Sequence, residues 1–273
     1  MPAHEVNLTL PDSRTVPITY KVFGFSTPDI PIGAVFANGL GCAPETTESP
    51  AEALAEKGFK TVTFEPDPTA RLTVRDRVHI MGELGRNVLG DYVAMGFGLG
   101  GDVATRVAYD DYEARAFEVA GLVDVAGSHE GGPSFIASMI TQLPEHVFAD
   151  PTNIGLPLYL DVLATSQDQG VRDYGAHIAK LSPPELAALH FGAVDLQGEA
   201  EVGGSLDQLL LYHGGPAYFV HGAGDKPPYV EDIKWQENIQ LREIAGAGHF
   251  LHTGSPAAYV GALTECLIEV NGR

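Results

Sequence analysis

Residues 96–101 (GFGLGG) form a glycine-rich turn between a short apolar run and a helix-like segment. The spacing fits two motifs with different chemistry. In G-x-G-x-x-G, matched by Gly96, Gly98 and Gly101, backbone N–H groups hold a dinucleotide pyrophosphate at a helix N-terminus. In G-x-S-x-G, a tight strand-to-helix turn presents a nucleophilic serine. The middle position here is Gly98, so a turn of the second kind carries no hydroxyl group.

The sequence around this glycine turn disfavours dinucleotide binding. The dinucleotide motif usually joins the first strand of a domain to its first helix, whereas two strand–helix units precede residue 96. An acidic residue should also end the next strand about 20 positions on. Asp124 comes later than that and is followed by further apolar residues. We therefore favour the nucleophile type of turn and keep dinucleotide chemistry as an alternative.

His249 lies in a second glycine-rich loop, residues 246–250 (GAGHF). A histidine beside glycines can turn its ring inward and act as a general base, because imidazole changes its charge near neutral pH. The alternative is a histidine in a surface loop, which is what we expect of His252. We expect Cys42 to be a packed or bystander thiol rather than a nucleophile, and Cys266, at core-like spacing in the last helix, to be structural.

The remaining histidines are scattered, and none forms an H-x-x-x-H or H-x-H pair beside a carboxylate. We therefore predict neither a metal site nor a cofactor. The histidines expected to be solvated or packed are His79, His129, His190 and His213.

The composition narrows the class of protein further. The chain has 273 residues, and 16 basic against 36 acidic side chains give a net charge of −20, which disfavours nucleic-acid binding. The N-terminus lacks the apolar core of a signal peptide, and no apolar run approaches the roughly 20 residues of a membrane helix. Two cysteines fit a reducing compartment. We expect a cytoplasmic protein without a membrane or nucleic-acid partner; its oligomeric state stays open.

Strand and helix patterns alternate from about residue 33 to residue 127, after an N-terminal hairpin. This alternation predicts βαβ units and a mostly parallel sheet. The first strand is expected in the apolar run at 33–41, which ends in glycines, and the others at 60–65, 91–96 and 117–127. The expected helices are 49–59, 73–89 and 102–114.

The alternation stops in residues 131–215, a proline-rich stretch with ten acidic and two basic residues. It resumes with strands at 216–225 and 239–248 and helices at 230–238 and 255–270. We therefore predict an α/β core made of residues 1–130 and 216–273. Residues 131–215, called the cap segment below, should fold over one edge of this core; a run of irregular connections is the alternative.

Four short segments, taken in their order along the chain, resemble the motifs of a known superfamily. They are a strand and loop at 35–41 (VFANGLG), the turn at 93–101 (VAMGFGLGG), a strand and turn at 219–229 (FVHGAGDKPPY), and a loop at 246–252 (GAGHFLH). Together they resemble the α/β-hydrolase superfamily over nearly the whole chain. Asn38 stands where that superfamily often has histidine, and Gly98 where it has the nucleophilic serine. The resemblance implies the α/β-hydrolase fold: a mostly parallel central sheet, flanking helices and a helical cap insertion.

The resemblance also implies roles for individual residues. His249 maps to the catalytic base and Asp225 to the acid that orients it. The backbone N–H groups of Leu40 and Leu99 map to the oxyanion hole. Asn38 would orient a substrate or, as we favour, support its loop. If Asp225 only shapes a turn, the substitute acids are Asp124 and Glu130.

The missing hydroxyl at Gly98 leaves three hypotheses. In the first, His249 is a general base for chemistry without a covalent intermediate, such as epimerisation or isomerisation, cyclisation or C–C cleavage, on a natural-product or peptide-like substrate. In the second, the protein is a conventional serine ester or amide hydrolase whose serine was changed to glycine. In the third, it is a non-catalytic binding protein on the same fold.

Overall fold

A computed structural model describes residues 2–26, 30–127, 135–150, 152–201, 205–225 and 230–272. Its strands form one eight-stranded sheet in the order β1-β2-β4-β3-β5-β6-β7-β8. The hairpin of β1 and β2 is antiparallel and joins β4 antiparallel, and the strands from β4 to β8 are all parallel. The predicted mostly parallel sheet is confirmed. The strands are β1 (Ala3–Thr9), β2 (Thr15–Phe23), β3 (Gly33–Ala37), β4 (Thr61–Pro66), β5 (Tyr92–Phe97), β6 (Val119–Val125), β7 (Ala217–Gly222) and β8 (Ile239–Ile244).

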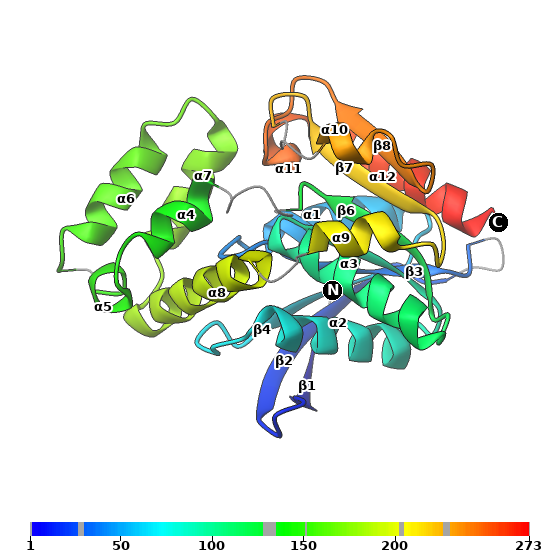
Figure 1. Ribbon diagram of the computed structural model, residues 1–273, viewed down its shortest axis with the longest axis horizontal. Coiled ribbons are helices and arrows are strands. Elements are labelled where there is room, and N and C mark those ends of the chain that lie inside the picture. The colour runs from blue at the N-terminus through cyan, green and yellow to red at the C-terminus, as the bar shows by residue number, and fades with distance from the viewer. Residues whose placement is uncertain are drawn as a thin grey trace.

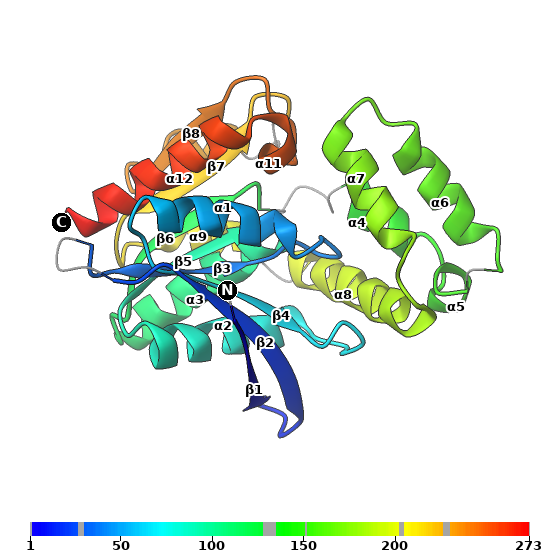
Figure 2. The ribbon, with the colours of Figure 1, turned by 180° about the vertical axis from the view of Figure 1, so that it is seen from behind.

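Helices cover both faces of the sheet, as Figures 1 and 2 show from opposite sides. One face carries α2 (Val74–Val88), α3 (Leu99–Ala114) and α9 (Ser205–Leu211), and the other carries α1 (Glu45–Glu56) and α12 (Pro256–Asn271). Two short helices, α10 (Val230–Ile233) and α11 (Leu251–Gly254), flank β8. Because both faces are covered, every residue of β3, β5 and β7 is buried, which explains their nearly continuous apolar sequences.

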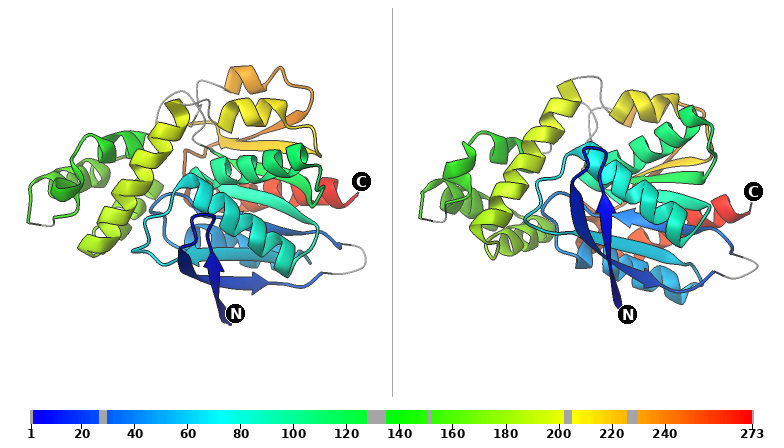
Figure 3. Two further views of the ribbon diagram at one scale, coloured as in Figure 1. Left: turned by 60° about the horizontal axis from the view of Figure 1, so that its bottom comes forward. Right: turned by 90° about the horizontal axis from the view of Figure 1, so that it is seen from below.

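The cap segment is helical where the structure describes it. Five helices lie together at one side of the sheet in every view, including both views of Figure 3. They are α4 (Phe135–Thr141), α5 (Glu145–Phe148), α6 (Gly155–Ala164), α7 (Gln169–Ile178) and α8 (Pro183–Glu201). Helix α9, at the end of the segment, packs against α3 instead. The division into a core and a separate cap domain stays a prediction.

Two expected helices differ from those observed. Helix α1 begins at Glu45 rather than near residue 49, because Thr46 and Thr47 are buried and extend its packed face by a turn. The helix expected over 230–238 ends at Ile233. Trp235, which should have continued its apolar face, is 77% exposed and therefore has no packing to hold a further turn.

The helices that the structure describes include none long and apolar enough to cross a membrane.

The tightest contact in the core lies between β5 and α3. A Cβ added at Gly96 would sit 1.7 Å from the carbonyl oxygen of Gly100. We predict that Gly96→Ala abolishes folding or lowers the free energy of unfolding by more than about 3 kcal/mol, because a backbone oxygen cannot rotate away. Urea denaturation followed by circular dichroism measures this.

Gly261→Ala is the matched control. The added Cβ would meet nothing within 4 Å on α12. This variant should gain about 0.5–1 kcal/mol, because alanine loses less chain entropy in a helix. Similar stability of the two variants would contradict the proposed contact.

Candidate active site

The glycine turn joins β5 to α3 in a conformation that side chains rarely adopt. Gly98 has φ +53° and ψ −121° and lies directly before the first residue of α3. Its N–H donates to the carbonyl of Val125 on β6 at 2.9 Å, and its own carbonyl accepts from the N–H of Gly101 at 2.8 Å. The turn is therefore held from the adjacent strand and from the first turn of the helix.

The other glycines of this turn are needed for close approach. A Cβ at Gly100 would lie 2.2 Å from the carbonyl oxygen of Ala37 on β3, and one at Gly101 would lie 2.4 Å from Oδ1 of Asp124. At Gly98, by contrast, the nearest atoms to an added Cβ are 3.8 and 3.9 Å away. Space thus excludes a side chain at Gly96, Gly100 and Gly101 but not at Gly98.

His249 and Asp225 are joined by a hydrogen bond. Nδ1 of His249 lies 2.7 Å from Oδ2 of Asp225. The turn after β7 and the loop at 246–250 are also bound together, because Gly224 N–H donates to the carbonyl of Ala247 at 2.9 Å. An ionised carboxylate only accepts, so in a neutral ring bonded to it Nδ1 carries the proton and Nε2 has the lone pair.

The free nitrogen of this pair faces the glycine turn. Nε2 of His249 lies 3.9 Å from the position that a Cβ at Gly98 would occupy. The ring also packs against Phe97, with ring centroids 5.3 Å apart. The structure therefore brings Gly98, His249 and Asp225 together, although the sequence separates the first two by about 150 positions.

The loop at residues 38–41, called the NGLG loop, lies on the other side of Gly98. The Cα of Gly39 is 3.8 Å from a Cβ built at Gly98. Among the described residues, no hydrogen-bond acceptor is found for the N–H groups of Leu40 and Leu99. These are the donors expected from the sequence, and their role in an oxyanion hole stays a prediction.

Asn38 holds the NGLG loop in shape. Its Nδ2 donates to the carbonyls of Cys42 and Ala43 at 3.2 and 3.0 Å, and its Oδ1 accepts from the N–H of Gly39 at 2.9 Å. Nδ2 also donates to Oε1 of Glu65 at 3.2 Å. These contacts match the loop-supporting role that we favoured.

The other sequence candidates have different surroundings. Asp124 is fully buried and accepts hydrogen bonds from Thr105 Oγ1 at 2.8 Å and from Gly127 N–H at 2.9 Å, so it braces β6 and α3. Glu130 and His129 lie outside the described residues. Burial raises the pKa of the Cys42 thiol far above its usual range, which keeps it protonated and unreactive.

His252 is a residue that the sequence analysis misjudged. It is half-buried rather than a surface loop histidine, and its ring meets the edge of Phe97 at 5.8 Å between centroids. Its Nδ1 is buried without a partner among the described residues. Burial lowers its pKa, so the ring is neutral at pH 7. One feature of the sequence could have indicated this burial: His252 follows His249 by three residues. In a helical turn this spacing puts both side chains on the same side, and here both rings contact Phe97.

Helix α7 of the cap segment packs directly on the loop that carries His249. A Cβ at Gly170 would lie 2.2 Å from Cβ of Phe250, and one at Gly248 would lie 2.4 Å from Oδ2 of Asp168. The ring of Tyr174 packs against Phe250 at 5.8 Å between centroids. His249 is therefore held from the core by Asp225 and from the cap segment by α7.

No group of three or more histidine, cysteine, aspartate or glutamate side chains among the described residues is arranged to hold a metal ion.

Comparisons with known proteins bear on the fold. No protein-family model matches the chain, and neither does any curated protein sequence. Its structure is similar to a thermophilic esterase from Thermogutta terrifontis, with 19% identity, a TM-score of 0.72, and 98% and 99% of the two chains covered. It is also similar to the enol-lactonase from Burkholderia xenovorans LB400, with 13% identity, a TM-score of 0.68, and 96% and 99% covered.

A third similar structure comes from work on carboxylesterases of the ammonia-oxidizing thaumarchaeon Nitrososphaera gargenis. It has 15% identity and a TM-score of 0.71, and the match covers 98% of this chain and 99% of that one. Likeness at these identities shows the fold and nothing finer. The chain has the α/β-hydrolase fold, as the sequence predicted.

The space at Gly98 leads to a prediction about a restored hydroxyl. A serine Oγ, one bond from the 3.9 Å Cβ position, could reach hydrogen-bonding distance of His249 Nε2. We expect Gly98→Ser to hydrolyse p-nitrophenyl acetate about 100-fold faster than Gly98→Ala, which adds the Cβ without the hydroxyl. Release of p-nitrophenol measures the rate.

The double variant Gly98→Ser, His249→Ala is the control for the base and should return to the rate of Gly98→Ala. Both single variants should lose some thermal stability, because φ +53° strains any residue with a Cβ. Equal rates for the serine and alanine variants would show that Nε2 does not reach residue 98.

Proposed function

We propose that this protein is an enzyme in which His249 acts as a general base without a covalent intermediate. The observation that carries the proposal is the 2.7 Å contact between His249 Nδ1 and Asp225, which leaves Nε2 facing the empty side of Gly98. The proposed base, His249, is oriented by the carboxylate of Asp225, whereas Gly98 has no side chain that could attack a substrate. The reaction class is therefore proton abstraction, from a carbon beside a carbonyl or from a water molecule.

The proposed steps use groups already described. Nε2 of His249 takes the proton, and the resulting imidazolium is stabilised by Asp225. The negative charge passes to the carbonyl oxygen of the substrate, where the N–H groups of Leu40 and Leu99 can donate hydrogen bonds. Return of the proton to the same carbon gives epimerisation, and return to a different carbon gives isomerisation. Attack of the enolate carbon on a carbonyl carbon of the same molecule gives cyclisation, and the new alkoxide takes the proton from the imidazolium of His249. For C–C cleavage, His249 takes the proton of a β-hydroxyl group instead, the Cα–Cβ bond breaks, and the enolate that leaves takes the proton back from His249. We propose a natural-product or peptide-like substrate.

A second candidate is a conventional ester or amide hydrolase in which serine 98 has been replaced by glycine. The room around Gly98 favours this candidate, because nothing packs into the space where a serine side chain would stand. Esterases and a lactonase are among the proteins with similar structures. The two candidates differ in whether the chain as it stands turns over a substrate.

The test is exchange of a carbon-bound proton. Methyl (S)-2-phenylpropanoate in D₂O has one acidic C–H beside its carbonyl and a stereocentre that records proton loss. We expect α-deuterium incorporation and racemisation without ester cleavage, followed by NMR and chiral chromatography. His249→Ala should lower the exchange rate by about 100-fold or more, because general bases contribute 10²–10⁴-fold.

His213→Ala is the matched control, since His213 is exposed and the next residue, Gly214, lies against Tyr112 at the far end of α3 from Gly98. It should leave the exchange rate unchanged. Exchange that persists in His249→Ala would overturn the proposed base. Ester cleavage by the unaltered chain would favour water activation over carbon deprotonation, and no exchange across a panel of such esters would favour a binding protein.

A further inference from the structure

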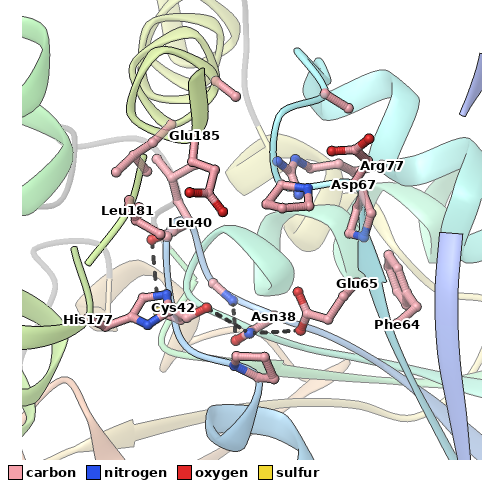
Figure 4. Close-up of a pocket in the computed structure, with 18 residues that line it drawn as sticks. Asn38, Leu40, Cys42, Phe64, Glu65, Asp67, Arg77, His177, Leu181 and Glu185 are labelled. Carbon is pink, nitrogen blue, oxygen red and sulfur yellow. Dashed lines mark hydrogen bonds between the residues drawn. The ribbon is translucent and has the colours of Figure 1, made fainter. Parts of the chain in front are cut away.

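A cavity of about 260 Å³ lies between the cap helices and the carboxyl ends of β3 and β4 (Figure 4). The NGLG loop forms one wall, and Leu181 and Leu189 from the cap segment form an apolar wall. Neither Gly98 nor His249 lines it. Ligand pockets are commonly about 300–1,000 Å³, so this one suits a single small molecule.

Arg77 on α2 brings a guanidinium group to the cavity wall. Its Nε is buried and has no hydrogen-bond partner among the described residues. Asp76, the preceding residue, is already bound to Arg14 at 2.9 Å and to the N–H of Thr73 at 3.0 Å. A buried Nε–H without an acceptor is suited to an acceptor such as a carboxylate.

Three carboxylates also line the cavity, together with Asn38 and His177. Glu65 comes from β4, Asp67 follows that strand, and Glu185 comes from α8. Figure 4 shows the Glu185 and Arg77 side chains entering the gap from opposite sides, with Glu65 below them. Burial raises the pKa of Glu65 to about 7, so a cation beside it would favour its ionised form.

The wall therefore holds one guanidinium and three carboxylates. A ligand with only a negative charge would meet Arg77 but be repelled by the carboxylates. The carboxylates of Glu65, Asp195 and Asp76 already act on the charge of Arg77. A ligand with only a positive charge would still leave its Nε without an acceptor. A molecule with both charges, a few bonds apart, satisfies both parts of the wall.

We propose that this cavity binds a zwitterionic α-amino acid with an apolar side chain. The carboxylate of the ligand lies on Arg77, its ammonium group lies toward Glu65 and Glu185, and its side chain lies against Leu181 and Leu189. Binding here requires no chemistry at His249, so the site can exist whether or not the proposed function holds.

The experiment is isothermal titration calorimetry with L-leucine and three matched probes. N-acetyl-L-leucine keeps only the carboxylate, L-leucinamide keeps only the ammonium group, and N-acetyl-L-leucinamide keeps neither. We expect L-leucine to bind about tenfold or more tightly than each probe, because each charge makes a charge-assisted hydrogen bond.

Variants of the cavity residues show which side chain binds the carboxylate of L-leucine and which binds its ammonium group. Arg77→Gln should weaken L-leucine about tenfold and leave L-leucinamide unchanged, whereas Glu65→Gln should weaken both. Arg75→Gln is the matched control, since Arg75 lies on the same helix, is exposed and does not line this cavity. Circular dichroism checks that each variant is folded.

Glu185→Gln, at a half-buried position of α8, tests the ammonium site independently if Arg77→Gln or Glu65→Gln fails to fold. It should weaken L-leucine and L-leucinamide but not N-acetyl-L-leucine. Equal affinity for L-leucine and the neutral probe would overturn the proposal, as would no binding of L-leucine at about 10 mM. Unchanged L-leucine affinity in folded Arg77→Gln would overturn it as well. The His249→Ala variant should bind L-leucine normally, which separates this site from the proposed function.

Discussion

The close contact between β5 and α3 determines the geometry of the candidate site. Because the backbones nearly touch at Gly96 and Gly100, the chain between them must turn sharply, and Gly98 takes a positive φ. The same turn directs any substituent at residue 98 toward His249. The arrangement is thus a property of the main chain, and it persists although position 98 has no side chain. His249 therefore lies beside position 98 whether or not that position carries a side chain.

Two polar centres meet at the NGLG loop. One side of the loop faces Gly98 and the imidazole of His249, and the other side faces the cavity that holds Arg77 and Glu65. Asn38 belongs to both, because one amide group fixes the loop and also binds Glu65. A change in the charge of Glu65 therefore bears on the loop that carries the Leu40 N–H.

The sequence was sufficient for the sheet, for the main flanking helices and for the candidate residues Gly98, Asp225 and His249. These depend on local patterns: apolar runs, glycine turns and their order along the chain. The end of α10 and the half-burial of His252 were missed, because both depend on whether a distant segment covers them. The presence of Arg77 and Glu65 in one cavity was invisible for the same reason, since helix spacing alone cannot say which cavity a long side chain enters.

Helix α7 rests on the loop that carries His249, with Gly170 against Phe250 and Asp168 against Gly248. This close fit makes the cap segment part of the mechanical support of the imidazole. A hinge motion of α7 away from the sheet would release the ring as well as admit solvent. Helix α8 packs instead against α4, α5 and α2. A displacement of α8 alone would therefore leave the contacts between α7 and the His249 loop in place.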